Sequence, residues 1–184
     1  MTITLANRIT LVRVFNVPLF VALVVYYKQG LAHGTATEPY RYLALAVFVI
    51  SIVLDVIDGW LARKRKEETQ LGAILDPVAD KALLVSAYVL LSGNASLAPV
   101  TPVPTWMAVL VISRDVVLVA GALVINLLSG RMRIVPRFLG KLTTFLQTAV
   151  VILALSSCPH RVLIVLVISA AVATLASGVQ YTID

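Results

Sequence analysis

The stretch that decides the fold is "LDVIDGWLARKRKEETQLGAILDPVADKALL", residues 54–84, in which a short charged run separates two apolar segments. The first segment carries Asp55 and Asp58, three positions apart, and the second carries Asp76 and Asp80, four apart. Side chains three or four residues apart share one face of an α-helix. Because the charged link is short, we expect two antiparallel neighbouring helices whose four carboxylates face each other at similar depth.

The rest of the chain is strongly apolar. Of its 184 residues, 60% are hydrophobic and the mean hydropathy is +0.97, whereas soluble domains are roughly 45–50% apolar. A membrane-spanning helix needs about 20 mainly apolar residues, and breaks rich in Gly and Pro separate the apolar runs. The predicted spans are 11–27, 42–61, 71–91, 105–128, 138–156 and 162–181. We therefore expect an all-α integral membrane protein with six transmembrane helices in a single domain, residues 1–184.

The basic residues predict the orientation of these helices. They gather near the N-terminus, in the link at 63–66 and in the connection at 131–141, whereas the opposite ends hold only Lys28, Arg41 and Arg161. Cytoplasmic loops of membrane proteins carry an excess of Lys and Arg. Both termini and the acidic cluster are thus expected on the cytoplasmic side of a membrane, with a bacterial inner membrane as the default. The net charge of +6 then needs no nucleic-acid partner.

Four facing carboxylates need a compensating positive charge, because they repel each other and burial penalises each charged form. Lys81 is the nearby lysine of the second segment, and it points about 100° away from Asp80 on a helical wheel. One lysine cannot balance four acids, whereas divalent cations can. Oxygen ligands without Cys or His favour Mg²⁺, Mn²⁺ or Ca²⁺ over zinc. Two such ions would suit a phosphoryl-type displacement.

Two other interpretations of the acids stay open at this point. Acids inside a membrane also mark ion pathways, as in a divalent-cation transporter, or form structural pairs. A pathway should carry polar groups across the whole bilayer, whereas these acids gather at one end. The small residues Gly59, Ala62 and Gly72 indicate either close helix packing or room for a flat base or a diphosphate.

The complete spacing is more specific than its parts. It reads Asp55-x₂-Asp58-Gly59-x₂-Ala62-Arg63-x₈-Gly72-x₃-Asp76-x₃-Asp80, and it resembles the signature of the CDP-alcohol phosphotransferase family at all eight positions. The resemblance implies a membrane enzyme, usually a homodimer, that moves a substituted phosphate from a CDP-linked donor to an alcohol and releases CMP.

The resemblance also implies roles for the motif residues. The four aspartates would hold one or two Mg²⁺ or Mn²⁺ ions, and Asp76 and Asp80 would be catalytic, with Asp80 as the general base for the acceptor hydroxyl. Because Asp80 lies farthest from the basic link, we expect its carboxyl to be the least hydrated. The donor pocket would be lined by Asp55, Gly59, Ala62, Arg63 and Gly72. Asn7 and Thr10 either lie near the donor diphosphate or cap the first helix.

Two branches of the family use CDP-diacylglycerol as the donor. One accepts glycerol 3-phosphate and makes phosphatidylglycerophosphate, and the other accepts phosphatidylglycerol and makes cardiolipin. The segment "PVPTWMAVLVISRDVVLVAG", residues 102–121, resembles eukaryotic-type cardiolipin synthases, whereas the first branch more often has Arg-Glu in place of Arg114-Asp115. We therefore expect phosphatidylglycerol as the acceptor, with glycerol 3-phosphate as the alternative.

Arg114 is the basic residue of the fourth predicted span. An arginine at membrane depth normally pairs with an acid or binds an anion. One interpretation is a structural pair with Asp115 or another carboxylate. The other is a clamp on the acceptor phosphate, which the bidentate guanidinium suits. In the second interpretation Arg137 and Lys141 would join it.

Overall fold

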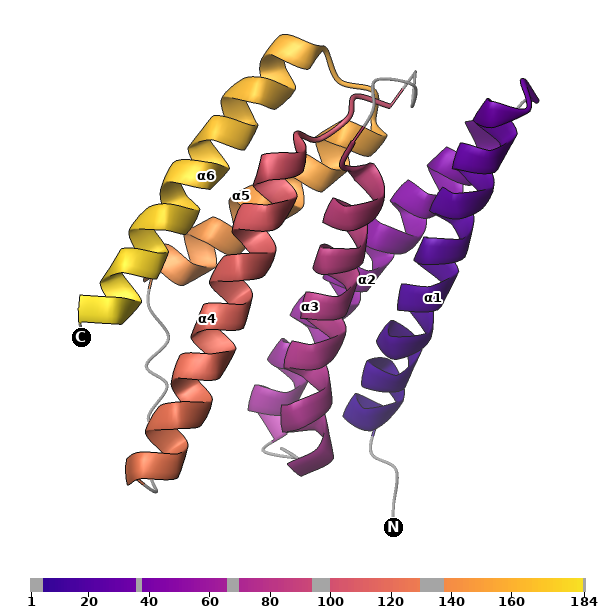
Figure 1. The fold of residues 1–184 in the computed structure, drawn as a ribbon. Coiled ribbons are helices and arrows are strands. Elements are labelled where there is room, and N and C mark those ends of the chain that lie inside the picture. Colours follow the sequence, from indigo (N-terminus) through magenta and orange to yellow (C-terminus); the bar gives the residue numbers. More distant parts are fainter. Residues whose placement is uncertain (1–4, 36–37, 66–69, 94–99, 130–137, 184) are drawn as a thin grey trace. The chain divides into compact units, whose positions relative to one another are not determined.

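The computed structural model describes the backbone of residues 5–35, 38–65, 70–93, 100–129 and 138–183, and the side chains of residues 12–35, 38–57, 78–93, 100–121, 139–178 and 180. Over this part of the chain the protein is helical, with six helices (Figure 1). They are α1 (Leu5–Ala32), α2 (Glu38–Arg65), α3 (Gln70–Leu91), α4 (Thr105–Ser129), α5 (Phe138–Leu155) and α6 (His160–Ile183). The prediction of six helices in an all-α fold is confirmed.

Several helices extend beyond their predicted apolar runs. The first run was predicted at 11–27, whereas α1 covers Leu5–Ala32. Its C-terminal end is a Schellman motif, in which Gly34 has a φ of 67° and the amides of Gly34 and Thr35 donate to the carbonyls of Leu31 and Gly30 at 3.2 and 3.0 Å. Hydrophobicity marks the part of a helix that meets lipid, so it leaves such polar end turns unmarked.

Three helices are long and apolar enough to cross a membrane, judged by length and composition over the described residues. They are Val12–Ala32 in α1, Glu38–Ile57 in α2 and His160–Gly178 in α6, and the apolar stretch Leu139–Leu155 in α5 is shorter. The described side chains of α3 and α4 cover only 78–91 and 105–121. Several membrane-spanning helices are therefore present, while the full set of six spans and the cytoplasmic termini stay predictions.

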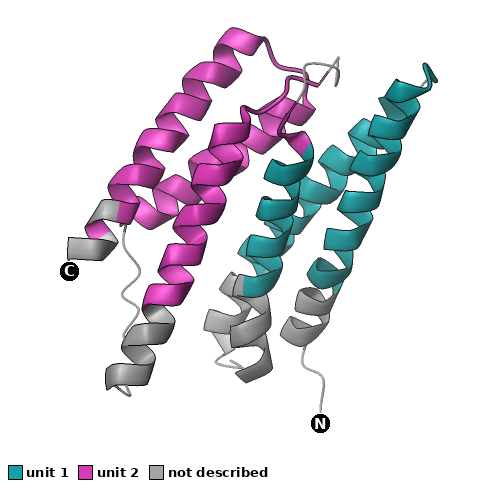
Figure 2. Ribbon diagram, in the orientation of Figure 1, with its two compact units in different colours: residues 1–90 teal, residues 91–184 magenta. Residues whose placement is uncertain are grey.

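The chain forms two compact units, residues 1–90 and 91–184 (Figure 2). In the first unit α1 packs against α2 in an antiparallel pair. Asn16 Nδ2 donates to Ser51 Oγ at 3.0 Å, and the rings of Phe20 and Phe48 lie 5.5 Å apart between centroids. Later residues of α1 contact earlier residues of α2. The N-terminal part of α1 therefore lies beside the C-terminal part of α2. A single domain over residues 1–184 stays a prediction.

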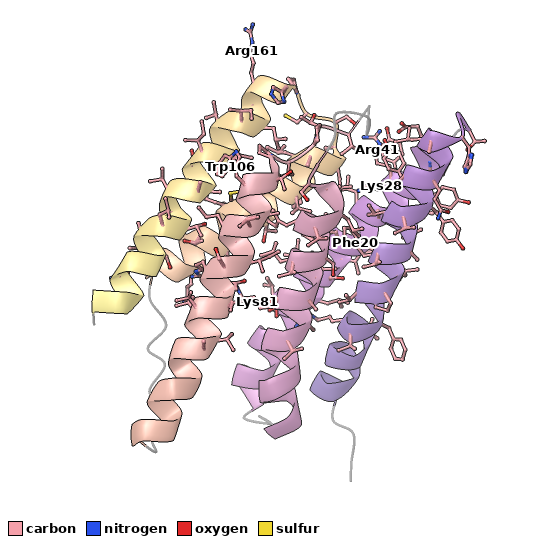
Figure 3. The ribbon with its side chains drawn as sticks, viewed as in Figure 1. Phe20, Lys28, Arg41, Lys81, Trp106 and Arg161 are labelled. Atoms are coloured by element: carbon pink, nitrogen blue, oxygen red, sulfur yellow. The ribbon has the colours of Figure 1, made fainter. Side chains whose placement is uncertain are left out.

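The other end of this helix pair, where α1 finishes and α2 begins, is aromatic and charged. Tyr26 and Tyr40 stack with centroids 6.0 Å apart. The buried guanidinium of Arg41 pairs with Glu38 and lies 4.4 Å from the centroid of the Tyr42 ring. Figure 3 shows Lys28 and Arg41 near this end. Tyrosines of this kind are typical of a membrane–water interface.

In the second unit α6 packs against both α5 and α4. The turn from α5 to α6 places Ser157 at a φ of 57°, and Thr101 Oγ1 donates to the Cys158 carbonyl at 2.7 Å, which ties the segment before α4 to this turn. Polar side chains bridge the helices inside the unit. Thr143 Oγ1 of α5 donates to the Ala173 carbonyl of α6 at 3.0 Å, and Gln147 Nε2 donates to Thr174 Oγ1 at 3.1 Å.

Candidate active site

Asp55, Asp80 and Arg13 meet inside the first unit, one from each of its helices. Arg13 Nη1 lies 2.9 Å from Asp55 Oδ1 of α2, and Arg13 Nη2 pairs with Asp80 Oδ1 of α3. The contact with Asp55 is an ion pair without the alignment of a hydrogen bond. The antiparallel packing of α1 on α2 explains the meeting, because Arg13 lies one turn before Asn16 and Asp55 one turn after Ser51.

The guanidinium of Arg13 is enclosed, whereas the carboxylates are open. The Arg13 side chain is 3% exposed, and those of Asp55 and Asp80 are each 45% exposed. A buried guanidinium is tolerated when acids neutralise it, and the two aspartates supply that charge. Asp80 is as exposed as Asp55, so exposure does not distinguish the two, and the expectation that Asp80 is the least hydrated of the four aspartates stays a prediction.

These two carboxylates have the chemistry of ligands for a hard divalent cation. The Oδ1 atom of each contacts Arg13, and each side chain is half-exposed, so part of each carboxylate is accessible to another partner. Oxygen donors of this kind suit Mg²⁺ or Mn²⁺. Over the described side chains no group of three or more His, Cys, Asp or Glu gathers, since the side chains of Asp58 and Asp76 lie outside that set. The residues present therefore fit a cation, with two of its four predicted ligands placed.

The helical spacing of all four aspartates is present in the backbone. Asp55 and Asp58 lie in α2, and Asp76 and Asp80 lie in α3, so each pair shares a helix face as predicted. The predicted donor-pocket residues also lie on helices, although their side chains are outside the described set: Gly59, Ala62 and Arg63 on α2, Gly72 on α3, and Asn7 and Thr10 on α1. The donor pocket itself stays a prediction.

Sequence reasoning missed Arg13. It counted this arginine with the cytoplasmic loop charge and considered only Lys81 as a partner for the acids. The structure corrects that view, since the positively charged guanidinium of Arg13 contacts two of the four aspartates. A signal was present in the sequence. Arg13 is separated from Phe20, Val24 and Tyr27 by seven, eleven and fourteen positions, which places it on the buried face of α1.

Arg114 is held within the second unit. Its Nη1 donates to Asp115 Oδ1 at 2.8 Å and its Nη2 donates to Ser177 Oγ of α6 at 2.9 Å. The Arg114 and Asp115 side chains are only 10% and 9% exposed. The Arg114 Nε is also buried and has no hydrogen-bond partner among the described residues. The pair with Asp115 is therefore present, and a role of Arg114 toward the acceptor phosphate stays a prediction.

The structure describes only one of the two residues that were predicted to assist Arg114. Lys141 lies in the first turns of α5 and is exposed. Arg137 lies outside the described residues.

Comparison with known proteins agrees with the motif. Residues 3–177 match the CDP-alcohol phosphatidyltransferase family. A "Probable phosphatidylglycerophosphate synthase" of Mycobacterium tuberculosis is 35% identical over 181 residues, which cover 96% of this chain and 79% of that protein. The "CDP-diacylglycerol--glycerol-3-phosphate 3-phosphatidyltransferase" of Bacillus subtilis is 36% identical over 162 residues, 85% of this chain and 79% of its own length. The protein of that name from Haemophilus influenzae is 33% identical, with 91% of both chains covered.

Proposed function

Since this chain belongs to the CDP-alcohol phosphatidyltransferase family, we propose that it transfers the phosphatidyl group of CDP-diacylglycerol to glycerol 3-phosphate. The products are phosphatidylglycerophosphate and CMP. The choice of glycerol 3-phosphate as the acceptor is supported by the similarity over most of the chain to relatives named for this reaction or its product. Membership of an enzyme family also removes the case for a divalent-cation transporter.

This proposal reverses the acceptor ranking that the fourth helix suggested. The likeness to cardiolipin synthases rested on residues 102–121, and in particular on Asp115 in place of glutamate. In the structure the Asp115 carboxylate pairs with Arg114 of the same helix. A glutamate could supply the same charge, so the Asp–Glu difference carries little information about the acceptor.

The proposed chemistry uses the carboxylates that contact Arg13. The acceptor hydroxyl oxygen attacks the phosphorus that carries diacylglycerol, the bond from that phosphorus to the CMP oxygen breaks, and CMP leaves with the electron pair. Asp80 takes the hydroxyl proton, because its carboxylate is half-exposed and lies beside Asp55 at the site. One or two Mg²⁺ or Mn²⁺ ions, when bound by the aspartates, would neutralise the donor diphosphate and improve the leaving group.

The setting of the reaction is part of the proposal. The aspartates lie at the cytoplasmic face of a bacterial cell membrane, where a soluble acceptor can reach them and the donor lipid can enter from the bilayer. Arg114, Arg137 and Lys141 are the candidates for binding the acceptor phosphate. A homodimer is expected from the family resemblance.

The test is a reconstitution with each acceptor separately. Purified protein is given CDP-diacylglycerol, Mg²⁺ or Mn²⁺, and either glycerol 3-phosphate or phosphatidylglycerol, and lipid products and CMP are measured. We expect phosphatidylglycerophosphate from the first mixture, no cardiolipin from the second, and no turnover in either once EDTA removes the metal. Cardiolipin as the sole product would restore phosphatidylglycerol as the acceptor.

A further inference from the structure

Arg13 touches the candidate site from its buried side. One guanidinium reaches carboxylates on two different helices, with Nη1 toward Asp55 and Nη2 toward Asp80. Both contacts use the Oδ1 atom of the acid. Both carboxylates stay half-exposed while the arginine is enclosed.

This arrangement fixes the relative position of the two acids. Asp55 belongs to α2 and Asp80 to α3, so the separation of their carboxylates is a tertiary property of the unit. A guanidinium is planar and presents its donors in a rigid fork. Two acids bound by different nitrogens of that fork are therefore held at a set spacing, whereas two unbridged carboxylates would repel each other.

We propose that Arg13 is a positioning residue that holds Asp55 and Asp80 in the geometry in which they bind a divalent cation. The proposal rests on the proposed function, because it takes these aspartates as the metal ligands. Arg13 does not touch substrate in it. It acts as the outer partner of ligating carboxylates, and loss of such a partner typically weakens metal binding about 10- to 100-fold.

A role in charge balance alone predicts the opposite change in cation affinity. The direction in which cation affinity changes when Arg13 is replaced therefore tests the proposal. If Arg13 only balanced the acids, it would repel a bound cation, and removing its charge would strengthen cation binding. If Arg13 positions the acids, removing it weakens cation binding although a repulsive charge has gone. Lysine keeps the charge and lacks the fork, so it separates charge from geometry.

The experiment measures Mn²⁺ binding to the full-length protein in detergent by electron paramagnetic resonance, without substrates. The variants are Arg13→Met and Arg13→Lys. The matched control is Arg41→Met, which removes another buried arginine of the first unit, paired with Glu38 at 2.6 Å at the far end of the α1–α2 pair. We expect both Arg13 variants to bind Mn²⁺ at least about tenfold more weakly and the control to stay within about twofold of the wild type.

Three outcomes keep this inference separate from the proposed function. Unchanged or tighter Mn²⁺ binding by either Arg13 variant would overturn the positioning role, and a variant that does not fold leaves the other to decide. Unchanged Mn²⁺ binding by Asp55→Asn would instead overturn the metal site of the proposed function. With Mn²⁺ saturating, the KM for glycerol 3-phosphate should be the same in Arg13→Lys and wild type, since Arg13 positions the acids and does not bind the acceptor.

Discussion

In the proposed mechanism Asp80 has two tasks. Its Oδ1 is paired with Arg13, and the half-exposed carboxylate would also bind a cation and take the proton of the acceptor hydroxyl. Replacing Asp80 with asparagine keeps the shape of the side chain and removes both its charge and its ability to take a proton. We expect Asp80→Asn to lower kcat by about 10²- to 10⁴-fold, measured as CMP release at saturating CDP-diacylglycerol and glycerol 3-phosphate.

A matched acid serves as the control for that prediction. Glu38 also pairs with a buried arginine of the first unit, Arg41, at the far end of the same helix pair. Glu38→Gln should therefore leave turnover within about twofold of the wild type. Full turnover by Asp80→Asn would exclude Asp80 as the base.

The acids could be foreseen from the sequence, whereas for Arg13 the sequence indicates only a buried position and not the acids that it contacts. Asp55 lies three residues from Asp58, and Asp80 lies four residues from Asp76. Helical periodicity alone therefore places each pair on one helix face. Arg13 meets them only because α1 packs in register against α2 and α3 lies beside it. Such a contact depends on tertiary packing, and a survey confined to the acids' own segments finds only Lys81.

At the scale of the helices, the sequence predicted their number and the breaks between them. The expected fifth span, 138–156, agrees closely with α5 at Phe138–Leu155, because Pro and Gly signals lie on both sides of that run. The end turns of α1 were missed, since polar residues there are satisfied in a helix and carry no hydrophobic signal. The hydrogen bonds that connect the helices of the second unit had no counterpart in the prediction either.

One of those connections can be measured. Ser177 of α6 is fully buried and accepts a hydrogen bond from Arg114 Nη2 of α4 at 2.9 Å. Ser177→Ala removes the acceptor and leaves a buried charged donor without it. We expect the free energy of unfolding in detergent to fall by about 1–2 kcal/mol. The measurement is a denaturant titration monitored by the circular dichroism of the helices.

Ser169 provides the comparison on the same helix. Its hydroxyl donates to the Val165 carbonyl one turn earlier and its side chain is exposed. Ser169→Ala should change the free energy of unfolding by no more than about 0.5 kcal/mol. Equal effects of the two substitutions would mean that the Arg114–Ser177 contact contributes nothing to the stability of the unit.

At the scale of the whole molecule, the predicted topology places the turn between α1 and α2 outside and the basic link between α2 and α3 in the cytoplasm. In a Cys158→Ser background, which removes the single native cysteine, we would place one cysteine at the exposed His33 or at Glu68. A membrane-impermeant maleimide should label His33→Cys in intact cells and Glu68→Cys only after permeabilisation. Labelling in the reverse order would invert the topology.

For the proposed acceptor, similarity along the whole chain carries more weight than a local sequence pattern. The fourth-helix segment is short, and its distinguishing residue, Asp115, is used inside the protein to pair with Arg114. Two relatives whose names include glycerol 3-phosphate match over 85% and 91% of this sequence. A pattern within one helix is therefore weak evidence about the acceptor.

The position of Arg13 along the chain has a consequence for biogenesis. Arg13 precedes Asp55 and Asp80 in the chain, so α1 can meet the bilayer before α2 and α3 have entered it. An arginine at the centre of a spanning helix raises the free energy of insertion by roughly 2.5–3.5 kcal/mol. Arg13 instead lies in the first turn of the apolar span Val12–Ala32, where its long side chain can reach water. The nascent helix can thus keep its charge hydrated at the membrane surface until α2 and then α3 arrive to enclose it.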